Sequence, residues 1–305
     1  MSHAEPGQPP THNPEQWNDW KDKLLGELYN KTAALINIGL DQQGDKESNI
    51  SEIQTASLRR LELMGIDSHQ ANDLWQTFSN DYFQSHTYGQ ITWHTALILE
   101  ARNNSDNEDG KLDNPLIQTR VHESSNSIQL VIYMKDRDYI FYDVATVLNR
   151  CAVAIVNAQI LNTSDGNALQ SFRLAPENTD SSEMPFIAQD IVEQLRESLS
   201  NDNDTKAATM SGSSKHKYFS SPTVISFKDI PDNETTLISI ETIDRSGVLQ
   251  KISKTFIDSR IRLLNARITT AGEKAIDHFS IGTSDDKMLS KSQKETLKQQ
   301  LKEIL

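Results

Sequence analysis

The sequence predicts an α+β protein, in which a layer of helices is followed by two copies of one small unit of strands and helices. Apolar residues recur at helical spacing before residue 102, and beyond it they alternate with polar residues, first at Ile128, Leu130 and Ile132. The same succession of elements then recurs 108 residues later. The length of 305 residues also suits about two domains.

Composition excludes several classes of protein. The 43 acidic and 30 basic side chains give a formal charge of −13, whereas a nucleic-acid partner needs a positive surface. The one cysteine, Cys151, cannot form an intrachain disulfide, and we expect it to be a buried, inert thiol in a reducing compartment. No apolar run approaches the roughly 20 residues that cross a bilayer, and the first residues lack an export signal. We therefore expect a cytoplasmic protein without a membrane partner.

Two amphipathic helices are predicted first. An N-cap at Asn13, followed by a proline, begins the first helix, and Gly65 provides a left-handed cap for the end of the second. The buried stripe of the first helix consists of Trp17, Trp20, Leu24 and Leu28. The buried stripe of the second consists of Ile50, Ile53, Leu61 and Met64. Spacings of three and four residues place each set on one helix face.

Capping boxes at Asp67–Gln70 and Thr87–Gln90 begin two further helices. These helices are expected to bury Leu74, Trp75, Phe78, Ile91, Trp93 and Ile98. We interpret Trp17, Trp20, Trp75 and Trp93 as core residues rather than stacking platforms for bases. His86 and His94 have no cysteine or second carboxylate in register, so they are interpreted as packing and capping residues rather than metal ligands.

The two repeated units follow polar segments at 102–114 and 200–217. The first unit has strands around 128–132, 152–160 and 168–174, joined by helices at 139–150 and at Phe186, Ile187, Val192, Leu195 and Leu199. The second has strands around 237–240, 261–269 and 275–281, with helices at 248–256 and 297–304. A turn at Ser164–Asn167 and another at Ala271–Lys274 join the paired strands.

Identical residues at a constant offset indicate a tandem duplication. The pairs are Asp136 with Asp244, Arg137 with Arg245, Asn157 with Asn265, Ala158 with Ala266 and Ile160 with Ile268, each 108 residues apart. The order strand, helix, strand, strand, helix predicts most of a ferredoxin-like βαββαβ domain, and Thr223–Phe227 could supply the missing strand of the second copy.

The predicted organisation has six parts. They are a disordered leader at 1–12, a helical domain at 13–101, a linker at 102–126, a first repeated domain at 127–199, a second linker at 200–221 and a second repeated domain at 222–305.

Several motifs resemble a known family. The segments 244–249 (Asp-Arg-Ser-Gly-Val-Leu) and 265–270 (Asn-Ala-Arg-Ile-Thr-Thr) resemble an ACT domain, a small amino-acid-sensing module. With 17–21 (Trp-Asn-Asp-Trp-Lys), 81–83 (Asp-Tyr-Phe) and 90–95 (Gln-Ile-Thr-Trp-His-Thr) before them, the ordered set resembles the C-terminal part of the bifunctional uridylyltransferase and uridylyl-removing enzymes. These enzymes modify the nitrogen regulatory protein PII, and the resemblance implies two ACT domains and glutamine as ligand.

Neither catalytic motif of that family is found. Its transferase domain holds Mg²⁺ with an Asp-x-Asp after a Gly-Ser, but Gly212-Ser213 lies in a linker and is followed by Asp229 and Asp232, spaced three apart. Its hydrolase domain needs a His-Asp dipeptide, and only the reversed Asp277-His278 occurs. We expect a regulatory part without catalytic residues, bound metal or cofactor, and without activity on its own.

The candidate amino-acid site is the corner between a strand and a helix in the second unit. Its predicted residues are Asp244, Arg245, Ser246, Gly247, Val248 and Asn265. Gly247 would allow close approach to the helix N-terminus, whose N–H groups suit a carboxylate, while Asp244 would receive the ammonium group. Asn265 could bind the ligand's polar groups. The alternative is purely structural, with Asp244 or Ser246 capping the helix and Asn265 satisfying a strand end.

The corresponding corner of the first unit is predicted to be weaker. Asp136, Arg137 and Asn157 remain, but Tyr139 occupies the position aligned with Gly247. A bulky side chain would stand where the ligand approaches, so we expect this copy to bind more weakly or to serve in packing the two units together.

Three functions remain open at this point. The first is a regulatory module that senses glutamine or another small amino acid, controls the catalytic domains of a parent enzyme by allostery and thereby acts on PII indirectly. The second, which no motif supports, is enzymatic modification of PII by this chain alone. The third is a stand-alone interaction protein that dimerises through its sheets or binds a separate catalytic subunit.

Overall fold

The computed structural model describes residues 43–105, 112–176, 181–200, 223–231, 234–245, 247–271, 274–285 and 287–305. Residues 52–305 form one compact unit, whereas residues 43–51 belong to a separate N-terminal unit and form the first turns of helix α2 (Gln43–Leu63). The predicted helix that begins at Asn13 lies outside the described residues, as do Trp17 and Trp20.

Helix α2 ends where the sequence predicts. Gly65 has φ +78°, and the chain closes the helix with hydrogen bonds from the Ile66 N–H to the Leu61 carbonyl (3.0 Å) and from the Gly65 N–H to the Glu62 carbonyl (2.9 Å). Leu61 is buried as expected, but Met64 is 55% exposed. Met64 was wrongly placed on the buried stripe, because the chain already leaves the helical path at this cap.

Three further helices follow, namely α3 (Ser68–Trp75), α4 (Asn80–Ser85) and α5 (Tyr88–Asn103). The capping box of Thr87 and Gln90 forms in full, whereas the Asp67 side chain accepts a hydrogen bond from the His69 N–H alone. The six-residue α4 was not predicted, since such a short helix has too few residues to show a periodic pattern.

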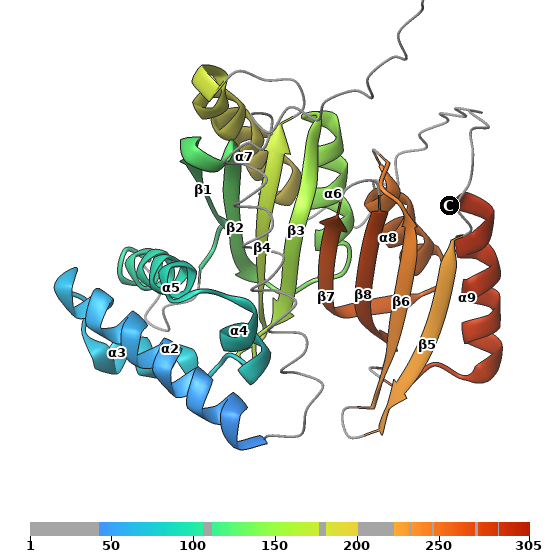
Figure 1. The fold of residues 1–305 in the computed structure, drawn as a ribbon, viewed down its shortest axis with the longest axis horizontal. Coiled ribbons are helices and arrows are strands. Elements are labelled where there is room, and N and C mark those ends of the chain that lie inside the picture. The colour runs from blue at the N-terminus through green and yellow to red at the C-terminus, as the bar shows by residue number, and fades with distance from the viewer. Residues whose placement is uncertain are drawn as a thin grey trace, which may run out of the picture. The chain divides into compact units, whose positions relative to one another are not determined.

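The remaining chain forms an eight-stranded antiparallel sheet with helices α6–α9 (Figure 1). The first repeat contains β1 (Leu116–His122), β2 (Ser127–Lys135), α6 (Ile140–Arg150), β3 (Val153–Asn162), β4 (Asn167–Pro176) and α7 (Met184–Ser200). The second contains β5 (Val224–Ile230), β6 (Thr235–Ile243), α8 (Val248–Asp258), β7 (Ile261–Ala271), β8 (Lys274–Thr283) and α9 (Lys291–Ile304). The strand order is β1-β2-β4-β3-β7-β8-β6-β5.

The α+β class and the two ferredoxin-like units are confirmed, with one difference in chain order. The edge strand of each repeat precedes the other strands, so each repeat runs ββαββα rather than βαββαβ. The edge strand β1 lies inside the predicted linker 102–126, because its few apolar residues follow a polar segment that dominates the local composition. The expected extra strand at Thr223–Phe227 is β5, at the edge beside β6.

The duplication is reproduced element by element. Helices α6 and α8 begin 108 residues apart, as do β2 and β6, and β1 and β5. The two half-sheets join where β3 pairs with β7, and the centre of that pairing sets Gln159 opposite Arg267, which are themselves equivalent positions. The repeats are therefore related by an approximate twofold axis through this seam.

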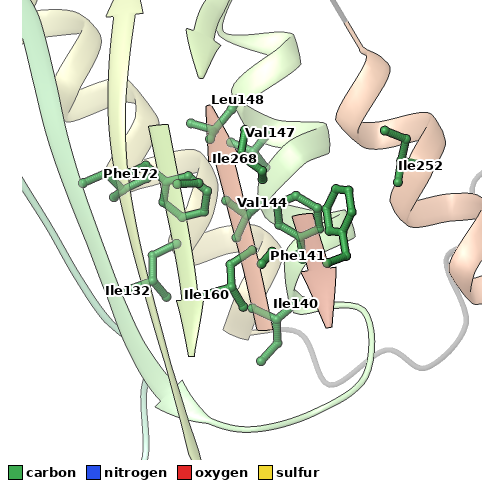
Figure 2. Packing of buried hydrophobic residues seen from close by; sticks show 14 of the residues in the cluster. Ile132, Ile140, Phe141, Val144, Val147, Leu148, Ile160, Phe172, Ile252 and Ile268 are labelled. Atoms are coloured by element: carbon green, nitrogen blue, oxygen red, sulfur yellow. The ribbon is translucent and has the colours of Figure 1, made fainter. Parts of the chain in front are cut away.

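One apolar core extends through both repeats. Figure 2 shows Val144, Val147 and Leu148 of α6 packed with residues of the sheet, including Ile268 from the second repeat. In α7 the buried stripe is Met184, Ala188, Ile191, Val192, Leu195 and Leu199. Phe186 was wrongly expected on that stripe and is 74% exposed, because it lies two residues after Met184 and so on the opposite side of the helix.

Helices α4 and α5 contact the first repeat through polar groups. The His86 Nδ1–H donates to the Tyr82 carbonyl (2.8 Å), and its Nε2 accepts from the Ser171 hydroxyl on β4 (2.7 Å). Burial lowers the pKa of His86 to about 4, so it stays neutral near pH 7. The Arg102 guanidinium lies 2.9 Å from Asp165, and the Arg120 guanidinium lies 4.3 Å from the ring centre of Trp93.

Candidate functional site: two related cavities at the seam between the repeats

Each repeat has a strand-to-helix corner that faces the other repeat. Helices α6 and α8 are preceded by residues in the left-handed region, Tyr139 with φ 72° and Gly247 with φ 80°. Each corner forms one side of a cavity, and the other side comes from the helix end and the strand start of the opposite repeat. The seam therefore creates two cavities that a single repeat could not form.

The first cavity has a volume of about 350 Å³. The corner of the first repeat contributes Asp136, Arg137 and Tyr139, while Arg260 and Arg262 come from the second repeat. Charged side chains from both repeats therefore line this cavity.

The second cavity has a volume of about 180 Å³. Its corner residues include Asp244, Gly247 and Val248, and the first repeat contributes Ala152 and Ala154 from the segment that follows α6. Asp244 is exposed, so solvent and small solutes reach it.

The offset of 108 residues relates the two cavities position by position. Asp136 corresponds to Asp244, and Tyr139 to Gly247. The charged pair Arg260 and Arg262 corresponds to Ala152 and Ala154. The two cavities share one backbone design, but only the first has these two arginines.

In the first cavity the protein supplies its own cation. Arg262 Nη2 lies 3.2 Å from Asp136 Oδ2, and its Nε lies 3.6 Å from Asp138 Oδ1. The Asn162 side-chain amide also donates to Asp136 Oδ2 at 3.1 Å. The carboxylate that would bind a ligand's ammonium group is therefore neutralised across the seam.

The second repeat has a buried acid that the sequence analysis missed, and it does not line the second cavity. Asp277 on β8 is fully buried, and neither of its carboxyl oxygens makes a hydrogen bond of good geometry with the described residues, although the Thr269 backbone amide lies close enough to act on it. Burial raises the pKa of Asp277 to about 7; the Thr269 backbone amide opposes this rise, and the charge of Asp244 adds to it. The available signal was a lone carboxylate on the apolar face of a strand, where Ala275, Phe279 and Ile281 are its neighbours.

Four of the six predicted ligand residues come together. Asp244, Arg245, Gly247 and Val248 line the second cavity, whereas Ser246 lies outside the described residues. Asn265 is on β7 and does not line either cavity.

In the weaker predicted site, too, only some of the predicted residues line the cavity. Asp136 and Arg137 line the first cavity, and Arg137 lies 3.0 Å from Asp143 of the same repeat. Asn157 is absent from its lining and donates instead to the Ile268 carbonyl across the seam, at 3.2 Å. This hydrogen bond joins β3 to β7 of the other repeat.

Other candidate groups lie apart from the cavities. Within the described residues, no cluster of three or more His, Cys, Asp or Glu could hold a metal ion. Cys151 is partly exposed rather than buried as expected, because it caps the end of α6. Burial of its thiol, then the nearby Asp190 carboxylate, raise its pKa to about 11, which keeps it protonated near pH 7.

Comparison with known proteins identifies related sequences. Residues 45–97, which span α2 to most of α5, match the family model described as uridylyltransferase GlnD fifth domain. A bifunctional uridylyltransferase/uridylyl-removing enzyme from Methylococcus capsulatus is 30% identical over 278 residues, which are 91% of this chain and 31% of the enzyme. The chain resembles the C-terminal region of these enzymes.

A second relative matches a similar share of the chain. The corresponding enzyme of Aliivibrio fischeri is 30% identical over 90% of this chain and 30% of its own length. The chain thus spans about a third of the relatives it matches. Among solved structures, aspartate kinase from Synechocystis covers 58% of the chain with 14% identity and a TM-score of 0.34. None of the helices in the described ranges has the length and apolar character needed to span a membrane.

Proposed function

We propose that this chain is the regulatory, amino-acid-sensing portion of a bifunctional uridylyltransferase/uridylyl-removing enzyme, with two ACT-type domains and glutamine as ligand. The observation that carries the proposal is the second cavity, which lies between two equivalent repeats and combines an accessible carboxylate, a glycine corner and a helix N-terminus. The resemblance to the C-terminal region of these enzymes supplies the biological setting.

The chemistry of the second cavity suits a free amino acid. Asp244 offers a counter-charge to an ammonium group, and N–H groups at the start of α8 favour a carboxylate. Gly247 has φ 80° at this corner, a conformation that glycine adopts without the steric cost that other residues bear. A volume of about 180 Å³ lies below the range usual for drug-sized ligands, in keeping with one small metabolite.

Binding in the second cavity would change how the two repeats are arranged at the seam. A ligand held between the α8 corner and residues of the first repeat stabilises one arrangement of the seam over others. Useful regulation needs only about 1 to 3 kcal/mol of coupling. The helices α4 and α5 contact β4 through His86 and Ser171, so a change at the seam can reach the helical layer and, in the parent enzyme, its catalytic domains. PII would then respond indirectly.

The alternative of a stand-alone protein that dimerises through its sheets is less favoured. The pairing of β3 with β7 already joins the two repeats within one chain, so these inner edges are not available to a second copy. The outer edge strands β1 and β5 are the edges left for such pairing.

Calorimetric titration with glutamine tests the proposal. We expect one ligand to bind per chain, and Asp244→Ala to weaken binding more than Asp136→Ala does. Saturation at a hundred times the dissociation constant should stabilise the fold by about 2.7 kcal/mol in a thermal melt. No heat and no thermal shift with millimolar glutamine would contradict the choice of ligand, and a larger effect of Asp136→Ala would reverse the ranking of the cavities.

A further inference from the structure

A buried polar side chain lines the first cavity. Gln170 lies on β4, where it is paired with Ile132 on one side and Ile160 on the other. It is 2% exposed and lines the cavity together with Ile160. Its side-chain Oε1 makes no hydrogen bond with any described residue. Because an unbonded buried acceptor is unfavourable, this oxygen favours a ligand that brings an N–H or O–H donor.

Three arginines line the same cavity, and aspartates of the protein bind two of them. Arg137 Nη2 lies 3.0 Å from Asp143 Oδ2, and Arg262 Nη2 lies 3.2 Å from Asp136 Oδ2. Arg260 is exposed and makes no ion pair with the described residues. Its guanidinium can therefore bind an anion from solution, and a carboxylate suits it because the two groups form parallel hydrogen bonds.

The backbone at Arg260 does not require an arginine. Arg260 lies just after α8 with φ 54°, and Ala152, its equivalent after α6, has φ 53°. Alanine thus adopts the same left-handed conformation at the same point of the repeat. The arginine side chain is therefore available for a role in the cavity, and its replacement by alanine should leave the backbone unchanged.

The rest of the corner favours an acid over a free amino acid. Residues 140–142, the first turn of α6, line the cavity, and the N-terminus of a helix favours negative charge. The corner carboxylate Asp136 is bound by Arg262 and by the Asn162 amide, which donates to it at 3.1 Å. An ammonium group would meet a neutralised carboxylate here, whereas a ligand carboxylate would meet favourable charge.

The size of the first cavity suits a ligand with an apolar substituent. Its volume of about 350 Å³ compares with about 180 Å³ for the second cavity, and it falls at the lower end of the range typical of small-molecule sites. Ile160, Phe256 and Leu263 are among the apolar residues that line it. A carboxylic acid with a neutral N–H donor and a short apolar group therefore matches the lining.

We propose that the first cavity is a second ligand site, which takes a small N-acylated amino acid. The ligand carboxylate pairs with Arg260, its uncharged amide N–H donates to Gln170 Oε1, and its acyl group lies against the apolar lining. The inference goes beyond the proposed function, because this ligand lacks the ammonium group on which binding in the second cavity depends. The two cavities then distinguish acylated from free amino acids.

Calorimetric titration of the whole chain with N-acetyl-L-glutamine tests this site. We expect one molecule to bind per chain, and saturating glutamine should not displace it. Arg260→Ala should weaken binding about fivefold, as for an ion pair that stays partly in water. Gln170→Leu should weaken it about tenfold, because the ligand's N–H then loses its acceptor in a buried place. N-acetyl-L-glutaminamide, which lacks the carboxylate, should bind more weakly to the wild type and show no change in Arg260→Ala.

The control is Arg196→Ala, the same change at an exposed arginine of α7 that lines neither cavity. It should keep wild-type affinity, and a thermal melt checks that each variant is folded. If Gln170→Leu does not fold, Arg260→Ala decides alone.

Three results would overturn the inference. The first is no binding of N-acetyl-L-glutamine to the wild type at millimolar concentrations. The second is an equal loss in Arg260→Ala and Arg196→Ala, or unchanged affinity in folded Gln170→Leu. The third is displacement by glutamine or a loss in Asp244→Ala, which would place the acid in the second cavity. Glutamine binding is measured separately, so the proposed function stands or fails independently of these results.

Discussion

The two corners of the seam have nearly the same backbone but different charged residues across the seam. Tyr139 and Gly247 have φ values of 72° and 80°, and each is followed by an 11-residue helix. Yet the first corner carboxylate, Asp136, is bound by Arg262, whereas the position equivalent to Arg262 in the second cavity is Ala154. A duplicated fold can thus keep its scaffold while exchange of a few side chains changes the charged groups that line each cavity.

The largest expected effect comes from making the second cavity like the first. Ala154→Arg would place a guanidinium at the position equivalent to Arg262, and we expect it to reduce glutamine affinity about a hundredfold or more, because a built-in cation competes with the ligand's ammonium. Calorimetry measures this loss. Ala154→Leu is the matched control for size, and an equal loss in both variants would show that bulk rather than charge distinguishes the cavities.

Asp277 allows a pH test of stability without any ligand. Its pKa is raised from 3.8 to about 7, so the folded state holds the proton more tightly than the unfolded chain, and stability is lost as pH rises between these values. Asp277→Asn should therefore unfold like the wild type at pH 4 and be more stable above pH 7, by on the order of a few kcal/mol. Denaturation in urea across this pH range measures the difference, and a constant difference would refute it.

Removal of the built-in cation should open the first cavity. Arg262→Ala breaks partly exposed ion pairs with Asp136 and Asp138, so we expect a loss of about 1 kcal/mol of stability. With its carboxylate released, the first cavity should bind glutamine weakly, raising the stoichiometry from one to two at high ligand concentration. A stoichiometry that stays at one would indicate that Tyr139, rather than Arg262, keeps this cavity closed.

The smallest effect concerns the backbone at the two corners. Tyr139 bears the steric cost of the left-handed region, of roughly 1 to 2 kcal/mol, which glycine avoids at some cost in unfolded-chain entropy. Tyr139→Gly should thus stabilise the fold by about 0.5 kcal/mol. Gly247→Ala should destabilise it by about 1 kcal/mol, although its new Cβ would lie 3.6 Å from the nearest atom of Asn149, an ordinary contact. Thermal melts of both variants measure these two changes in stability, which are expected to have opposite signs.

Local sequence signals succeeded where the cause of the structure is itself local. The cap at Gly65, the capping box at Thr87 and the hairpin turn at Gly166 depend on residues within a few positions of one another, and all three form. The strand β1 escaped prediction because its place is set by pairing with β2, which draws its apolar residues into the core. Phe186 was misplaced because apolar character alone does not fix the phase of a helix face.

The predictions for the candidate site also succeeded where residues are close in the chain and failed where they are distant. One cavity is lined by four of the predicted residues, namely Asp244, Arg245, Gly247 and Val248. They lie within five positions of the chain, so the strand-to-helix corner itself brings them together. Asn265 was assigned to that corner by its chemistry, but its strand position keeps it out of the cavity lining. Asp277 lies about thirty residues along the chain from Gly247, and only its sheet register sets it beneath α8.

By itself, the sequence determined the α+β class, the duplication and the chemistry available at each corner, because helix caps, turns and periodic apolar faces are consequences of neighbouring residues. The tertiary structure decided that β3 pairs with β7, that Arg262 reaches Asp136 across the seam, and that Asp277 is fully buried. These outcomes depend on the distance between groups far apart in the chain. The types of residue present do not specify these distances, which are set only when the two half-sheets pair.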